Sequence, residues 1–254
     1  FNIKTSAFSP VIESVDQAII GMHPCDIRAL SLMDRVFAAG APDPNYLARR
    51  SRTLVIGADC MPDDYCFCKS LGNSEAESGF DIFLHAIGKG FLVRTGSDKG
   101  RAILAQYART REPSLKEFRE FQSLRLKRDS SFKAGVNAPP AELPSIYAKS
   151  DESKVWGKIG AICTGCGSCN NVCPTCYCFD VKDEVKADLA EGERVRTWDG
   201  CTLEDFAKVA GGHNFRKTRA ERLRHRFNRK FRYLSSAFDM LFCVGCGRCS
   251  RACL

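Results

Sequence analysis

The chain has 254 residues, 44% of them hydrophobic and 27% charged, and a formal net charge of +8. This composition excludes a disordered chain, and no apolar stretch approaches the roughly 18 residues of a membrane-spanning helix. The length corresponds to about two domains of ordinary size. Because the sequence starts at Phe1 without methionine and stops one residue after a cysteine motif, we interpret it as a piece of a longer chain.

The first part of the chain alternates between strand-like and helix-like patterns. Apolar runs and strand-like stretches cover 18–22, 53–58, 80–87 and 90–95, and helix-like patterns cover 27–37, 102–108 and 115–126. Such alternation predicts a mixed α/β domain over residues 1–133.

A proline-bearing stretch separates this part from the rest. Three prolines lie within residues 134–152, which we predict to be a linker because proline interrupts helices. Residues 153–254 form the second predicted domain. Between its two cysteine runs, apolar residues recur at helical spacing from Ala220 to Leu234, so we expect a mostly helical spacer.

Cysteine is the residue type that carries the chemistry. There are fifteen cysteines, an odd number, and eleven of them lie between Cys163 and Cys253. Short runs of closely spaced cysteines indicate metal binding by thiolates, which requires a reducing compartment.

Two runs share the spacing that wraps a [4Fe-4S] cluster, C-x2-C-x2-C-x3-C. Pro174 follows the first run, whereas Leu254 follows the second. In such pairs, the fourth cysteine of each run binds the cluster of the other run. The predicted ligands are Cys163, Cys166, Cys169 and Cys253 for the first cluster and Cys243, Cys246, Cys249 and Cys173 for the second. Zinc is the alternative, but zinc sites typically use two separate C-x2-C pairs.

A third set of cysteines has no general signature. It consists of Cys25, Cys60, Cys66 and Cys68, of which the first two each follow a predicted strand. We predict that these four hold a third [4Fe-4S] cluster, with a zinc site or buried unliganded cysteines as alternatives.

Three cysteines remain outside these sets, namely Cys176, Cys178 and Cys201. They are too few for a four-thiolate site. We therefore interpret them as structural cysteines, with a redox or metal role as the alternative.

The segment from Arg216 to Arg232 contains nine basic residues and one acid, Glu221. Such a helix ordinarily suggests nucleic acid or a membrane surface. Three clusters of charge about −2 would, however, lower the chain's +8 to about +2. We expect Arg222 and Arg226 to lie along the clusters and raise their reduction potentials. The alternative is a solvated or partner-facing charged surface.

No dinucleotide-binding motif, P-loop or nucleophile and base pair is present. Clusters that have four thiolate ligands pass single electrons but have no open iron for a substrate, so electron conduction is the predicted role. The alternatives are a nucleic-acid-binding protein or a zinc-stabilised scaffold.

Several motifs together resemble one protein family. They are residues 21–30 (GMHPCDIRAL), 66–68 (CFC), 173–180 (CPTCYCFD), 198–201 (WDGC), 210–216 (AGGHNFR) and 221–226 (ERLRHR). The sequence is similar to the iron–sulfur subunits of anaerobic sulfite reductase and of cytoplasmic nickel–iron sulfhydrogenase, which in the sulfhydrogenase is the beta subunit.

The resemblance implies an α+β fold class, in which an N-terminal mixed α/β domain is followed by an α-helical ferredoxin domain. It also implies a cytoplasmic complex containing a flavin subunit that binds NAD(P)H and a catalytic subunit with a nickel–iron site, siroheme or a similar group. The chain would be the non-catalytic subunit that transfers electrons between them, without contacts to nucleic acid or membrane.

Overall fold

The computed structural model describes residues 1–254, which form two compact units. The sheet unit comprises residues 12–140 and 243–248, and the helical unit comprises residues 1–11, 141–242 and 249–254. The predicted α+β fold class is confirmed, since both helices and strands are present. The second cysteine run is divided between the units, an arrangement that the chain order does not reveal.

The sheet unit is built on four strands in the order β1-β2-β3-β4. Their bounds are β1 Gln17–Met22, β2 Thr53–Ala58, β3 Ile82–Ile87 and β4 Gly90–Thr95, as the sequence predicts. β1 and β2 are parallel, β2 and β3 are parallel, and β3 and β4 form an antiparallel hairpin. The parallel pairs follow from the connections, since a parallel pair needs a long crossover.

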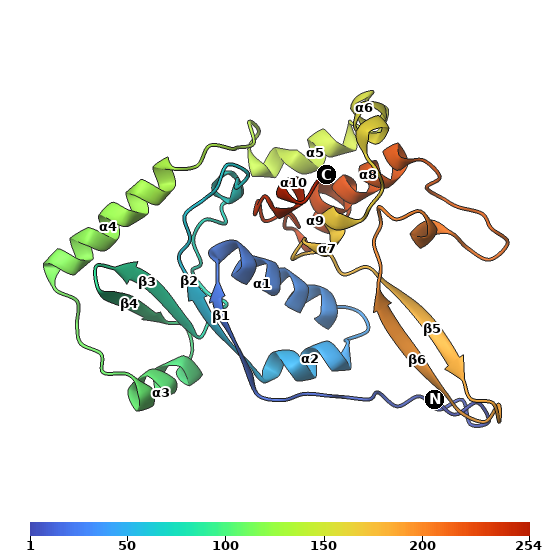
Figure 1. The fold of residues 1–254 in the computed structure, drawn as a ribbon, viewed down its shortest axis with the longest axis horizontal. Helices are drawn as coiled ribbons and strands as arrows, with labels where there is room; N and C mark the ends of the chain where they lie inside the picture. The colour runs from blue at the N-terminus through green and yellow to red at the C-terminus, as the bar shows by residue number, and fades with distance from the viewer. The chain divides into compact units, whose positions relative to one another are not determined.

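Four helices accompany this sheet, α1 (Pro24–Ala38), α2 (Pro44–Ser51), α3 (Asp98–Tyr107) and α4 (Leu115–Ser130). α1 contacts β2, α3 contacts β4 and α4 contacts β3 (Figure 1). The core lies between α1 and the sheet, where Ile27 packs with Val55, Phe80 and Phe83. Only α2 is absent from the sequence prediction, because it has eight residues and no buried face.

The helical unit begins where residues 134–152 were predicted to be a linker. This stretch is not without structure, because it contains α5 (Leu143–Ala148), which buries Leu143. The unit also contains α6 (Val155–Ile162), α7 (Ser168–Asn171), α8 (Arg219–Asn228), a π-helical turn (Arg229–Tyr233) and α9 (Leu234–Phe238), and the chain ends with α10 (Arg248–Arg251). α6 lies against α8 so closely that a Cβ on Gly160 would be 2.8 Å from the Ala220 nitrogen.

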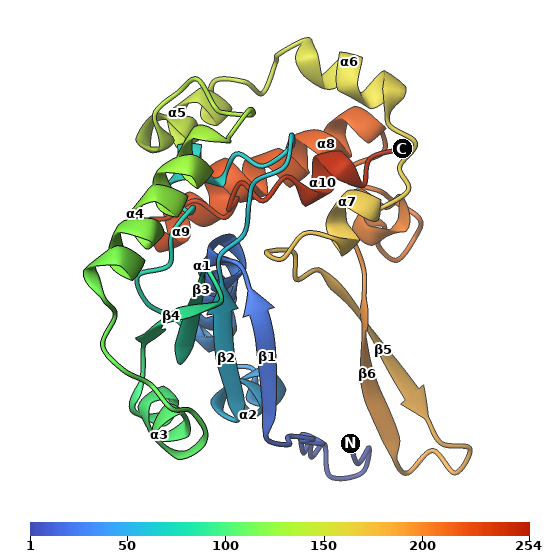
Figure 2. The ribbon, with the colours of Figure 1, turned by 60° about the vertical axis from the view of Figure 1, so that its left-hand side comes forward.

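The prediction of a mostly helical spacer between the cysteine runs is wrong for its first part. This part is an antiparallel hairpin of β5 (Phe179–Val185) and β6 (Gly192–Trp198). Alternating apolar residues of strand-forming type, such as Phe179 and Val181, favour this structure. Figure 2 shows the hairpin extending away from α7, with the N-terminus at its far end.

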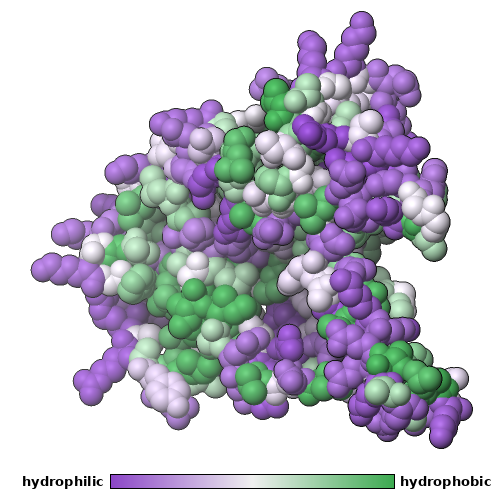
Figure 3. Space-filling view, turned by 45° about the vertical axis from the view of Figure 1, so that its right-hand side comes forward, coloured by the Kyte–Doolittle hydropathy of each residue, from purple (hydrophilic) through white to green (hydrophobic).

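Hydrophobic side chains are exposed around the far end of the hairpin (Figure 3, lower right). Phe8, Val185 and Leu189 are 58%, 48% and 70% exposed. Clusters of exposed apolar residues are typical of surfaces that contact other proteins. None of the helices is both long and apolar enough to cross a bilayer.

Candidate metal centres

The first cysteine run follows directly on α6. Gly165 and Gly167 have φ values of +75° and +77°, left-handed conformations that glycine tolerates best and that reverse the chain around the cysteines. The N–H of Gly165 lies 3.4 Å from the Sγ of Cys163. The loop therefore presents backbone amides to thiolate sulfur, as iron–sulfur sites require.

The cysteines of this run differ in environment. Cys166 is exposed, and hydrogen bonds from the side chain and the backbone of Ser168 lower its pKa to about 7. Burial raises the pKa of Cys169, whereas Arg226 opposes that shift. Cys249 is near enough to contribute to the same raised pKa, so the structure brings a member of the second run beside the first.

Three buried cations lie on α8 and the π-helical turn. Arg222, Arg226 and Lys230 are 5%, 7% and 7% exposed. Arg226 donates hydrogen bonds to the carbonyl oxygen of Cys169 (2.7 Å) and to the Sγ of Cys176 (3.2 Å). These contacts place a positive charge within the loop of the first cysteine run.

None of these three cations forms a salt bridge with a carboxylate. Lys230 Nζ donates to the carbonyl oxygen of Thr175 (2.6 Å), and Arg222 donates to the carbonyl oxygen of Lys217 (2.8 Å). A buried charge without a counter-ion costs several kcal/mol. Thiolates carrying a cluster would supply the missing negative charge, so the residues present fit such a group.

Other basic residues of this segment point elsewhere. Arg224 donates to the carbonyl oxygen of Asp151, and Arg232 forms a salt bridge of 2.9 Å with its carboxylate. The segment from Arg216 to Arg232 therefore combines both expected roles, with some cations beside cysteines and others in ordinary pairs.

Part of the second run lies in the sheet unit, against the loop that carries Cys66 and Cys68. The N–H of Phe67 donates to the carbonyl oxygen of Gly245 (2.8 Å). Gly245 has φ +72°, and a Cβ there would lie 2.6 Å from the Cα of Cys68. The Sγ of Cys66 lies 3.7 Å from the carbonyl oxygen of Cys246. Sequence reasoning missed this association, because the segments are about 180 residues apart.

The four cysteines of the third predicted set are brought together within the sheet unit. Cys25 lies in the first turn of α1, and its thiol forms a hydrogen bond with that of Cys68. This bond and burial raise the pKa of Cys25. Burial and the nearby Cys25 raise the pKa of Cys60 to about 11, and the same two causes raise that of Cys66.

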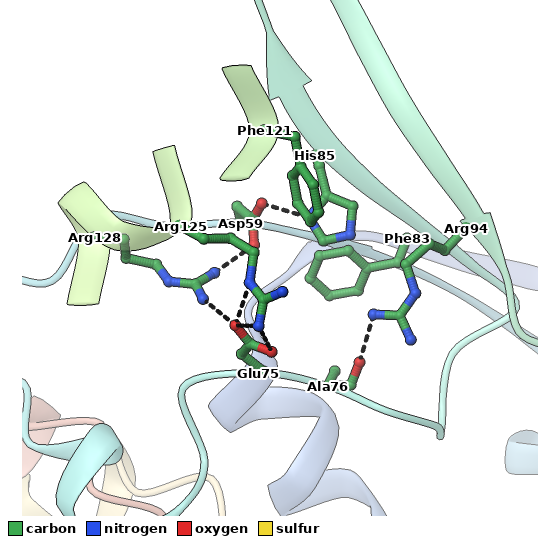
Figure 4. A pocket seen from close by; sticks show the side chains of 9 residues that line it. All are labelled: Asp59, Glu75, Ala76, Phe83, His85, Arg94, Phe121, Arg125 and Arg128. Atoms are coloured by element: carbon green, nitrogen blue, oxygen red, sulfur yellow. Dashed lines mark hydrogen bonds and ion pairs between the residues drawn. The ribbon is translucent and has the colours of Figure 1, made fainter. Parts of the chain in front are cut away.

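Asp59, next to Cys60, belongs to a network of charged side chains that lines a pocket in the sheet unit (Figure 4). Arg128, 5% exposed, donates to Asp59 Oδ1 and to Glu75 Oε1, both at 2.8 Å. His85 Nδ1 lies 2.6 Å from Asp59 Oδ2. The network fixes the chain beside Cys60 to α4 and β3.

The three remaining cysteines lie in the helical unit. Cys176 is hydrogen-bonded to Cys173, whose pKa this bond lowers. Cys178 and Cys201 are hydrogen-bonded to each other and are both buried. Asn170, which the sequence did not single out, contacts the thiol of Cys201. Its position after Cys169 in the motif is the one signal that could have identified it.

No three His, Cys, Asp or Glu side chains lie as close together as the ligands of one metal ion. The ligands of a zinc ion must all reach within about 2.3 Å of it. A cubane accepts a wider arrangement, because each thiolate binds a different iron.

Comparison with known proteins yields two matches. Residues 162–254 match a family described as a 4Fe-4S dicluster domain. The whole chain is 41% identical, over 261 aligned positions, to sulfhydrogenase 2 subunit beta of Pyrococcus furiosus, of which the alignment covers 75%. No solved structure matches the chain.

Proposed function

The chain belongs to the family of sulfhydrogenase beta subunits, and on this premise we propose that it is the non-catalytic electron-transfer subunit of a hydrogenase complex. Bound [4Fe-4S] clusters would each accept and release one electron. The chain's own contribution is to hold them, to supply amide donors and cations around them, and to keep water away from the buried side.

The observation that carries this proposal is the pair of identical cysteine runs, because both lie inside the residues that match the dicluster domain. We assign the ligands as the spacing predicts. They are Cys163, Cys166, Cys169 and Cys253 for one cluster and Cys243, Cys246, Cys249 and Cys173 for the other. The buried, carboxylate-free Arg222, Arg226 and Lys230 support the presence of negative groups nearby.

A third cluster is proposed on Cys25, Cys60, Cys66 and Cys68. The mutual effects of these thiols on their pKa values support their convergence. Arg248, whose guanidinium contacts both carboxylate oxygens of Asp26 and lies near Cys25, adds a positive charge at the same place.

The proposed partners are a flavin-containing subunit that binds NAD(P)H and a catalytic subunit. A nickel–iron catalytic subunit is favoured over a siroheme one, because the matched relative is a sulfhydrogenase subunit. We propose a cytoplasmic location, since thiolate-bound iron needs a reducing compartment.

Metal analysis of the anaerobically purified chain tests the proposal. Three cubanes give about twelve iron and twelve acid-labile sulfide per chain, and reduction gives paramagnetic resonance signals. Zinc without sulfide contradicts electron transfer. Mass spectrometry of the native complex tests the partners, and a siroheme subunit in place of a nickel subunit would contradict the hydrogenase assignment.

A further inference from the structure

Cys178 and Cys201 form a buried pair of thiols at the base of the β5–β6 hairpin. Cys178 precedes β5, and Cys201 lies three residues after β6. The N–H of Asp199 donates to the carbonyl oxygen of Cys178 (3.1 Å), which holds the two strand ends together. The two cysteines are 8% and 3% exposed, and their side chains are hydrogen-bonded to each other.

Asn170 connects this pair to a predicted cluster ligand. Its Nδ2 donates to the Sγ of Cys201 over 3.7 Å, and its Oδ1 lies 3.6 Å from the Sγ of Cys169. The arrangement depends on Gly200, because a Cβ there would lie 2.4 Å from Asn170 Nδ2. The dithiol is therefore separated from the first cysteine run by one side chain.

A second connection runs through Arg226. Its guanidinium donates to Asn170 Oδ1 (2.8 Å) and to the Sγ of Cys176 (3.2 Å). Cys176 is in turn hydrogen-bonded to Cys173, the predicted ligand of the second cluster. The dithiol thus lies at the end of a continuous series of contacts with ligands of both ferredoxin-type clusters.

The pair has the properties of a redox-active dithiol and not of a metal site. The hydrogen bond from Cys201 lowers the pKa of Cys178, and the same bond raises that of Cys201, so one thiolate and one thiol are favoured. No third ligating side chain completes a site for a single metal ion. The sulfurs of a disulfide are about 2.05 Å apart, and rotation of two side chains whose strand ends are already joined can reach that distance.

We propose that Cys178 and Cys201 exchange two electrons with the neighbouring clusters as a dithiol and disulfide couple, an inference that rests on the proposed function. On oxidation the two S–H bonds break, one bond forms between the Sγ atoms, and two protons leave to solvent. The two electrons pass singly to two oxidised clusters, each of which is reduced by one electron. Reduction reverses each step. The chain would thereby join one-electron carriers to a two-electron store.

The test uses the cluster-loaded protein in its complex, poised anaerobically at a series of potentials with mediators. Samples are denatured in acid with an alkylating reagent and digested with trypsin without reduction. Cleavage after Lys158, Lys182, Arg196 and Lys208 yields peptides 159–182 and 197–208. We expect these to become cross-linked as the potential rises, along a two-electron titration curve.

Two variants identify the bond. Cys178→Ser should abolish the cross-link while leaving the iron content unchanged, and Cys176→Ser, the matched control, should retain both. Free thiols at every potential, loss of the cross-link in Cys176→Ser, or loss of iron in Cys178→Ser would each overturn the dithiol. Iron and sulfide are measured in the same samples. Their presence without a cross-link refutes only the dithiol, and their absence refutes the proposed function together with it.

Discussion

Arg226 donates a hydrogen bond of 3.2 Å to the Sγ of Cys176 from a position where the arginine is 7% exposed. The same guanidinium bonds to the carbonyl oxygen of Cys169 at 2.7 Å. No carboxylate pairs with it, and nearby thiols raise its pKa although burial alone would lower it. Its positive charge is therefore directed at the cysteines of the first run.

Replacing Arg226 with Met should lower the midpoint potential of at least one cluster. A unit charge on the order of 8 Å away, at an effective dielectric constant of about 20, changes the energy of an added electron by about 2 kcal/mol, or roughly 90 mV. Potentiometric titration followed by paramagnetic resonance measures the shift. Arg226→Lys should restore much of it. Arg232→Met, which removes a cation paired with Asp151, is the matched control, and equal shifts in both variants would contradict the prediction.

Replacing Cys66 and Cys68 with Ser should remove one cluster. We expect a loss of about four iron per chain, because two ligands of one cubane are lost. Iron and sulfide analysis checks the number, and Cys178→Ser provides a cysteine variant that should retain all the iron. An unchanged iron content in the double variant would rule out the third cluster on these residues.

Gly245→Ala tests the close approach of the second run to the Cys66–Cys68 loop. Alanine costs about 1 kcal/mol for its positive φ and about 1–3 kcal/mol more for the collision with Cys68. Gly211→Ala is the matched control, since Gly211 has φ +84° but no atom within 4 Å of its added Cβ. The unfolding temperature should fall by several degrees more in Gly245→Ala than in Gly211→Ala, and equal falls would argue against the contact.

Replacing Arg128 with Met should destabilise the sheet unit by about 3 kcal/mol, because Asp59 and Glu75 would lose a buried partner. Arg125→Met serves as the comparison, since Arg125 also pairs with Glu75 but its side chain is 43% exposed. An exposed pair contributes about 0–1 kcal/mol. Urea unfolding measures both changes, and similar losses would show that burial of Arg128 is not the deciding factor.

The sequence predicts most of the secondary structure, because the decisive signals are local. The strands at 53–58 and 90–95 appear at the predicted residues. The β5–β6 hairpin was missed since the helical pattern beyond Ala220 was extended over the whole spacer. α5 was missed because its prolines were interpreted as a sign of a linker, whereas proline is compatible with the first turn of a helix.

By itself the sequence determined which chemistry the chain can support. Three thiolates at spacings of three residues, followed by a fourth, select a cubane through short-range chain geometry alone, and the motifs identify the family. Tertiary structure decided which distant residues share a site. It placed residues 243–248 against Cys66 and Cys68, turned Arg226 towards Cys176 while Arg232 pairs with Asp151, and joined Cys178 to Cys201. Such contacts depend on how the chain closes loops of tens to hundreds of residues, and local spacing does not encode the result.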